Sequence, residues 1–380
     1  NIEIRIFNPL VNRDWFRNIE LVINLDVAGR RMHNKVFITD NSSAIIGGRN
    51  IGDEYFDDRN NLNFVDLDLL TVGPIVNDIS TSFNEYWDSP WAQPIEELSK
   101  TTIVKKQITT FRSKLRDKWH RAKNTLHFEA IQQSDFTKKI INKKIPFVWA
   151  EAELFYDKPE KLTTSTRAEL NKNFAPQVMP FFEQAKKEVL IASPYFVPGS
   201  IGLNWLINMK QQGAEIKILT NSLSATDVIA VHAGYKKYRS ILIKQKINIF
   251  ELKSSAHGLF LKTRRIITGK SKTSLHAKYM SIDQQFVFIG SANIDPRSNS
   301  LNTEIGIMIN SKELALQTAA LFTRATSIEN SYQLSINNKD LIWRTKDGEK
   351  EVSYVREPNT SIFRRLITFL LGLLPIESLL

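Results

Sequence analysis

Residues 32–51 read MHNKVFITDNSSAIIGGRNI, and residues 275–294 read LHAKYMSIDQQFVFIGSANI. The two stretches align without a gap, and the alignment superimposes His33, Lys35, Asp40, Gly47 and Asn50 on His276, Lys278, Asp283, Gly290 and Asn293. Each copy has the pattern of an alternating strand, a short turn, a second apolar strand and a turn of small residues. A motif repeated in this way predicts two copies of one structural unit.

Around the second copy, hydrophobic periodicity predicts alternating elements: strands at 189–197, 215–221 and 247–252, and helices at 201–212 and 226–244. Before the first copy only the last strand has a counterpart, Ile2–Phe7, so we expect the first lobe to lack the elements that match 189–246. A strand is predicted at 149–156, and further helices at 181–187, at 312–326 and over the last twenty residues. Alternating strands and helices indicate an α/β fold with a mixed sheet in each lobe, flanked by helices.

The repeat divides the chain into two lobes. We expect the first at residues 1–145, N-terminally truncated, with a basic helical connector at about 101–144. The second spans 146–380 and ends in an apolar tail, 361–380. One copy of the motif makes half a site, so we expect the active site between the two pseudo-symmetric lobes.

Composition narrows the chemistry. Among 380 residues, 51 are Lys or Arg and 40 are Asp or Glu, a net charge of +11 that favours a polyanionic partner, either nucleic acid or an anionic membrane face. The absence of cysteine excludes a cysteine nucleophile, a disulfide scaffold and cysteine-ligated metals. No apolar run is long enough to predict a membrane-spanning helix.

The repeated residues suit phosphodiester chemistry. Alternate residues of a strand share a face, so each histidine points the same way as the lysine two positions later. The lysine ammoniums and the amides of Asn50 and Asn293 can bind phosphate oxygens. One neutral histidine can attack phosphorus to form a phosphohistidine, while the other, protonated, donates to the leaving oxygen.

Each histidine needs a carboxylate behind its second ring nitrogen. We predict that Glu304 serves His276 and that Asp66 holds the corresponding place in lobe one, for His33. We expect Asp40 and Asp283 to hold the motif loops together rather than to touch the substrate.

The doubled pattern H-x-K-x4-D followed by G-G/S-x-N resembles the phospholipase D superfamily. The segments RRMHNK (30–35), GGRNIGDEYF (47–56), DLDLLTVGP (66–74), LTNSL (219–223), DVIAVHAGY (227–235), GSANIDPRS (290–298) and LNTEIG (301–306) together resemble bacterial cardiolipin synthases, with most likeness to the C type. The resemblance runs over essentially the whole chain. Ala292, where an aromatic residue often stands, is a small departure.

The resemblance implies a metal-independent, cofactor-free site whose catalytic residues are His33, Lys35, Asp40, His276, Lys278 and Asp283. It favours His33 as the nucleophile, although the pseudo-symmetry leaves His276 open. It implies phosphatidyl transfer to phosphatidylglycerol, with phosphatidylethanolamine or phosphatidylglycerol as donor, at the bacterial inner membrane as a peripheral protein. No nucleic-acid partner is expected, and an accessory protein is left open.

The same residues are compatible with two other functions. A phospholipase D-type hydrolase or nuclease would use the same residues with water as acceptor, and a non-catalytic binding protein would carry a relict site. The basic segment 105–123 is either a solvated helix face or a contact for anionic headgroups. The tail either lies in a membrane interface or docks on the protein's own core. His232 and Tyr235 are either structural or line the lipid headgroup site.

Overall fold

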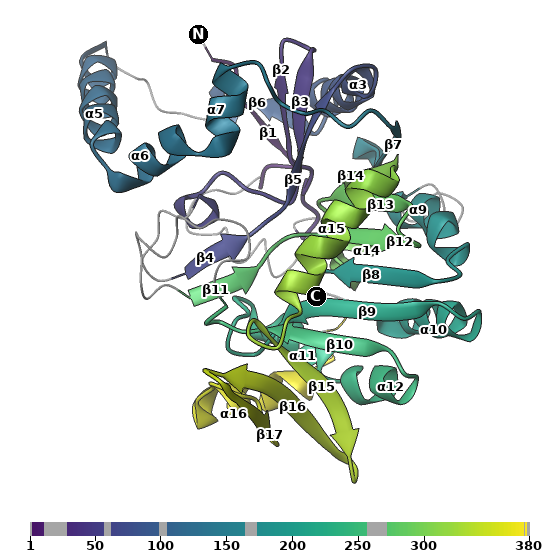
Figure 1. Ribbon diagram of the computed structural model, residues 1–380. Helices are drawn as coiled ribbons and strands as arrows, with labels where there is room; N and C mark the ends of the chain where they lie inside the picture. Colours follow the sequence, from purple (N-terminus) through teal and green to yellow (C-terminus); the bar gives the residue numbers. More distant parts are fainter. Residues whose placement is uncertain are drawn as a thin grey trace.

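The computed structural model describes residues 2–10, 29–56, 62–98, 105–163, 173–256, 272–375 and 377 (Figure 1). The first lobe is built on an antiparallel sheet of β2 (Val36–Thr39), β3 (Ser43–Gly47) and β5 (Asp68–Val72). Its other elements are β1 (Arg5–Phe7), η1 (Asp53–Tyr55), β4 (Leu62–Val65), α3 (Ile75–Trp87), β6 (Ala92–Pro94) and α4 (Ile95–Leu98). Helix α3 packs on the sheet because its buried residues Val76, Ile79, Ser82 and Tyr86 recur at helical spacing.

Three helices form the connector: α5 (Lys105–Lys123), α6 (Leu126–Gln133) and α7 (Asp135–Ile141). Thr125 and Ser134 cap α6 and α7 through side-chain oxygens that accept from the third residue along. In Figure 1 the connector is drawn beside the first lobe, with α5 farthest from it. These helices lie within the predicted basic connector, about 101–144, and we propose that this segment joins the two lobes.

The second lobe is built on a mixed sheet of ten strands, in the order β17-β16-β15-β10-β9-β8-β12-β13-β14-β7. These strands are β7 (Glu151–Tyr156), β8 (Glu188–Ala192), β9 (Glu215–Asn221), β10 (Asn248–Leu252), β12 (Tyr279–Ile282), β13 (Phe286–Gly290), β14 (Ile305–Asn310), β15 (Ser331–Asn337), β16 (Asp340–Asp347) and β17 (Lys350–Tyr354). The remaining elements are β11 (Lys272–Leu275), η2 (Pro159–Leu162), α9 (Phe174–Glu183), α10 (Gly199–Gln211), α11 (Ile229–Tyr235), α12 (Arg239–Lys244), α14 (Pro296–Ser300), α15 (Lys312–Ala325) and α16 (Ile362–Gly372). No helix in the described part of the chain is both long and apolar enough to cross a membrane.

The predicted fold class is confirmed, with local corrections. The large sheet is mixed, whereas the three-stranded sheet of lobe one is antiparallel. The helix predicted at 226–244 is two helices, separated by a turn at residues 236–238. The helix predicted at 181–187 lies earlier, at Phe174–Glu183, and contains Pro180.

The lobes share one topology. The antiparallel order β2-β3-β5, followed by α3, repeats as β12-β13-β14 followed by α15, and the pair β1–β6 repeats as β10–β15. In lobe two, β8 and β9 lie between β12 and β10, but the described residues of lobe one provide no strand between β2 and β1. An apolar cavity of about 180 Å³ lies there, and Met32, Asn34 and Val36 line it.

An apolar core joins the lobes. It combines Ala44, Ile46, Val76 and Ile79 of lobe one with Ile305, Ile307 and Ile309 of β14. The lobes also exchange backbone pairs, since β4 pairs in parallel with β11 and Met32 bridges to Thr303. We propose that the division of the chain falls at residue 145, because β7 already belongs to the large sheet.

Candidate active site

The two backbone pairs that join the lobes position the candidate catalytic residues. Leu275 pairs with Val65, and the next residues are His276 and Asp66. Met32 pairs with Thr303, and the next residues are His33 and Glu304. The backbone N–H groups of His33 and His276 donate to the carbonyls of Thr303 (3.0 Å) and Val65 (2.7 Å), so each histidine is anchored to the opposite lobe.

This pairing corrects the sequence-based assignment of carboxylates. Nδ1 of His33 lies 2.9 Å from Oε2 of Glu304, and Nδ1 of His276 lies 2.6 Å from Oδ2 of Asp66. Both carboxylates support a histidine, as predicted, but the prediction that each serves the histidine of its own lobe is wrong. The partners are 271 and 210 residues apart in sequence, because the strands that precede them pair across the lobes.

The carboxylates fix the tautomer of both rings. An ionised carboxylate only accepts hydrogen bonds, so each Nδ1 carries a proton and each Nε2 carries a lone pair. Nζ of Lys278 lies 3.1 Å from Nε2 of His276, whereas no hydrogen bond from the described residues reaches Nε2 of His33. The side chain of His33 is also more open, 24% exposed against 6% for His276. Nε2 of His33 is therefore the more accessible of the two Nε2 atoms.

The lysines follow the same symmetry. Nζ of Lys35 donates to the carbonyl of His33 (2.7 Å), and Nζ of Lys278 donates to the carbonyl of His276 (2.6 Å). Burial lowers the pKa of Lys35 to about 7 and that of Lys278 to about 8. Nearby carboxylates oppose this shift, among them Glu304 and Asp66. A bound phosphate would raise both pKa values and favour the charged form of each lysine.

Both histidines are neutral in the free site. Burial, followed by the charge of Lys278, lowers the pKa of His276 to about 3. Burial also lowers the pKa of His33, against the opposing charge of Glu304. In the predicted mechanism, the histidine that donates a proton must therefore gain it when the substrate binds. A phosphodiester anion between the rings would raise both pKa values and favour protonation of one ring.

The carboxylates stay ionised. Although burial acts in the other direction, the hydrogen bond to His276 and the charge of Lys278 lower the pKa of Asp66. In the same way, the electrostatic interaction and hydrogen bond with His33, and the charge of Lys35, lower the pKa of Glu304. Gly48 leaves room for Asp66 and Lys278. An added Cβ at Gly48 would lie 2.7 Å from Oδ1 of Asp66 and 3.1 Å from Cδ of Lys278.

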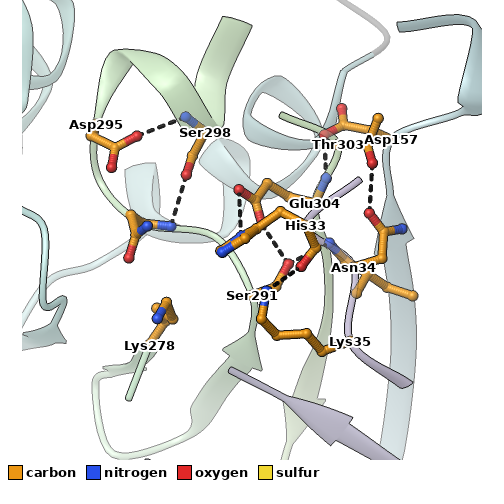
Figure 2. A network of polar contacts seen from close by, with 12 residues as sticks. His33, Asn34, Lys35, Asp157, Lys278, Ser291, Asp295, Ser298, Thr303 and Glu304 are labelled. Carbon is orange, nitrogen blue, oxygen red and sulfur yellow. Dashed lines mark hydrogen bonds and ion pairs between the residues drawn. The ribbon is translucent and has the colours of Figure 1, made fainter. Parts of the chain in front are cut away.

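Sequence reasoning missed the residues that hold Glu304. Figure 2 shows Ser291 donating to its carboxylate and Asp157 lying behind it. The backbone N–H of Glu304 donates to Oδ2 of Asp157 (2.8 Å), which also accepts from Nζ of Lys161 (2.8 Å). Ser291 belongs to the second motif's small-residue turn, so its place in the repeat was the available signal; Asp157 has no such signal.

The other four predicted site residues lie in the turns that end or connect the motif strands, and their contacts differ. The carboxylate of Asp283 accepts from the backbone N–H groups of residues 186–188 at 2.8–2.9 Å, so it holds the second motif's turn to the start of β8. Asp40 lies in the equivalent exposed turn, at a positive φ of 48°. Nδ2 of Asn50 donates to the hydroxyl of Tyr55 (2.7 Å), and the Tyr55 ring lies 5.0 Å from the ring of His276. Asn293 lies near Ser298, whose hydroxyl accepts from its backbone N–H at 3.2 Å.

His232 and Tyr235 do not line the site. Both are 2% exposed, and Tyr235 donates to Glu251 at 3.1 Å, while His232 lies 3.6 Å from Glu357. Arg239 joins the two acids, with Nη atoms at 2.9 Å from Glu251 and 2.6 Å from Glu357. The prediction that they contact a lipid headgroup is wrong for this structure, because they belong to a buried ion-pair cluster beneath α16.

Two carboxylate-held histidines and two lysines that meet between pseudo-symmetric lobes form a site whose chemistry suits a phosphodiester substrate. The comparisons give the family. Residues 178–326 match the family model described as cardiolipin synthase, PLD-like domain. Cardiolipin synthase C of Escherichia coli (strain K12) is 35% identical over 381 residues, covering 100% of this chain and 79% of that protein. The chain belongs to the cardiolipin synthase family of the phospholipase D superfamily and is an enzyme of this phosphatidyltransferase class.

More distant relatives agree with this placement. Cardiolipin synthase B of the same strain is 25% identical over 283 residues, which are 74% of this chain and 52% of that protein. The crystal structure of phosphatidylserine synthase from Haemophilus influenzae matches 92% of this chain and 71% of that chain, with a TM-score of 0.55 at 14% identity. This last likeness shows a common fold.

Proposed function

We propose that the protein synthesises cardiolipin by transferring a phosphatidyl group to the terminal glycerol hydroxyl of phosphatidylglycerol. The donor is phosphatidylethanolamine or a second phosphatidylglycerol. Family membership supports the lipid substrate. The observation that carries the chemistry is the pair of histidines, each with Nδ1 held by a carboxylate and Nε2 directed away from it.

In the proposed first step, Nε2 of His33 attacks the donor phosphorus and forms a P–N bond. The P–O bond to the headgroup breaks, and His276, protonated once the anionic substrate is bound, gives its proton to the leaving oxygen. Lys35 and Lys278 bind the phosphate oxygens as charge builds on them. In the second step His276 takes the proton of the acceptor hydroxyl, whose oxygen attacks phosphorus and releases His33.

We also propose that the protein works at a bilayer surface of the bacterial inner membrane, as a peripheral protein. Helix α5 supports this placement. Its apolar residues Ile108, Phe111, Leu115 and Trp119 are 41–61% exposed and recur at helical spacing between basic side chains. Such a helix suits an anionic lipid surface, where each lysine or arginine contributes about 1 kcal/mol.

Lipid mass spectrometry tests the proposal. The protein is incubated with phosphatidylglycerol vesicles, with and without phosphatidylethanolamine, while released glycerol and ethanolamine are measured. We expect cardiolipin from wild type and none from His33→Ala, and ethanolamine release would identify the donor. Phosphatidic acid without cardiolipin would instead assign a hydrolase. Cleavage of a soluble phosphodiester such as DNA, without lipid turnover, would assign a nuclease.

A further inference from the structure

Helix α16 faces solvent with its apolar side. Its outward residues are 51–78% exposed: Ile362, Phe363, Leu366, Phe369, Leu370 and Leu373. A surface helix of a soluble domain ordinarily turns such a face toward the core. The outward face of α16, defined by these six residues, is therefore built to be covered by something other than the core of this chain.

The inward side of α16 combines polar with half-buried apolar residues, and Arg364 holds it to the protein by hydrogen bonds. Nε of Arg364 donates to the carbonyl of Leu223 (2.8 Å), and Nη2 donates to the carbonyl of Thr226 (2.7 Å). Thr368, buried against the protein, donates to the carbonyl of Arg364 one turn earlier (2.8 Å). The helix thus docks on the protein through Arg364, Thr368 and the half-buried Ile367 and Leu371, and the six outward residues do not supply the contact surface.

The contact made by Arg364 leads to the active site. The loop that it holds follows β9, and Asn221 at the end of β9 is hydrogen bonded to both backbone groups of Leu275, at 2.9 and 2.8 Å. His276 is the next residue. The outward face of α16 is therefore fixed, through one loop and one amide side chain, to the segment that carries a catalytic histidine.

Charge and length favour a lipid surface as the occupant. Lys236 and Lys237 are exposed where α11 ends, beside the end of α16, and Arg356 is exposed just before its start. The whole chain carries a net charge of +11, which complements an anionic bilayer. With 11 residues, α16 is too short to span a bilayer but long enough to lie in its interface.

We propose that the outward face of α16 is the surface by which this protein docks on an anionic lipid bilayer. The inference rests on the proposed function, since a phosphatidyl substrate is held in that bilayer. Docking through α16 would hold the segment 275–276 at a fixed orientation to the membrane, because Arg364 and Asn221 connect the two.

Vesicle co-sedimentation tests the docking surface directly. The face variant is Leu366→Gln/Phe369→Gln, and a second, Ile362→Gln/Phe363→Gln, repeats the test on the first turn. The matched control, Ile201→Gln/Leu316→Gln, removes two exposed apolar side chains from α10 and α15. Circular dichroism and thermal unfolding check that each variant is folded.

With vesicles of phosphatidylglycerol and phosphatidylethanolamine, we expect the face variants to bind at least tenfold more weakly than wild type. The control variant should stay within twofold of wild type. On short-chain phosphatidylglycerol below its micellar concentration, kcat/KM of the face variants should also stay within twofold, since they do not touch the site. Vesicle binding of folded face variants equal to that of wild type would overturn the inference.

The two proposals fail separately. If wild type makes cardiolipin but the face variants bind vesicles as well as wild type does, the docking surface is contradicted and the proposed function stands. If vesicle binding depends on α16 but wild type converts no lipid, the docking surface is supported and the proposed function is contradicted. A second copy of this chain is the other possible occupant of the face, and light scattering without lipid tests it. If wild type forms a dimer and the face variants are monomers that still bind vesicles, the face is a dimer interface.

Discussion

The exchange of carboxylates between the lobes depends on four residues, each one position beyond a backbone pair. His33 and Glu304 follow Met32 and Thr303, and His276 and Asp66 follow Leu275 and Val65. The motifs identified the histidines and lysines from sequence, because their spacing is local. The partners of the histidines could not be assigned in this way, since strand pairing over more than 200 residues leaves no local pattern.

Double-mutant cycles on unfolding free energy test the exchange. His276→Gln with Asp66→Asn, and His33→Gln with Glu304→Gln, should each show a coupling of about 0.5–3 kcal/mol, because these pairs share a hydrogen bond. The same-lobe pairs, His33 with Asp66 and His276 with Glu304, should be additive within about 0.5 kcal/mol. Larger coupling within the lobes than between them in urea unfolding would contradict the crossed arrangement.

The lowered lysine pKa values predict the pH dependence of activity. Loss of a proton removes the positive charge that binds phosphate, and kcat/KM reports the free enzyme. With pKa values of about 7 for Lys35 and about 8 for Lys278, kcat/KM should fall as pH rises above 7. Arginine stays charged over this pH range, so in Lys35→Arg the fall of kcat/KM should begin at higher pH, near the pKa of Lys278. The same substitution should lower the rate.

A pH series at constant ionic strength measures this fall of kcat/KM at alkaline pH. Lys312→Arg, an exposed substitution at the start of α15, is the control and should leave it in place. An alkaline limb that Lys35→Arg does not move would mean that another group titrates there.

At the scale of elements, periodicity located most strands and helices but not their exact ends. The strand expected at 189–197 ends at Ala192, before Pro194, because proline cannot donate to a ladder. The split between α11 and α12 was missed, since the apolar pattern of 226–244 continues across the turn at residues 236–238. Hydrophobic spacing reports which face is buried, and it is less informative about where a backbone turns.

The pairing of β13 with β14 predicts that glycine is required at position 306. Gly290 lies opposite Gly306, and an added Cβ on Gly306 would lie 2.2 Å from Cζ of Phe288. Gly306→Ala should therefore lower the free energy of unfolding by about 1–3 kcal/mol, the usual cost of overpacking a core. Urea unfolding measures it.

Gly372 provides the control for this substitution. An added Cβ there would meet nothing closer than 3.9 Å, so Gly372→Ala should be neutral or slightly stabilising. Equal effects of the two substitutions would show that the cost comes from the backbone and not from the contact with Phe288.

At the scale of the molecule, the repeat in the sequence predicted two lobes around one site. It did not predict how firmly they are joined. Ile46 of β3 and Ile307 of β14 are both fully buried in one core that spans the lobes. The periodicity of each strand indicated only that these residues face an interior, and the sequence did not show that the interior is shared.

The shared core predicts that the lobes unfold together. Ile46→Ala should cost about 2–5 kcal/mol, as for other buried isoleucines. The side chains of β3 and β14 are buried in the same core. In Ile46→Ala, amide hydrogen exchange that proceeds through global unfolding should therefore accelerate equally in β3 of lobe one and in β9 of lobe two. Ile249→Ala, in the separate core of lobe two, is the reciprocal variant and should accelerate exchange in β3. Faster exchange confined to the substituted lobe would contradict this, and the histidine–carboxylate pairs would then break whenever either lobe opened.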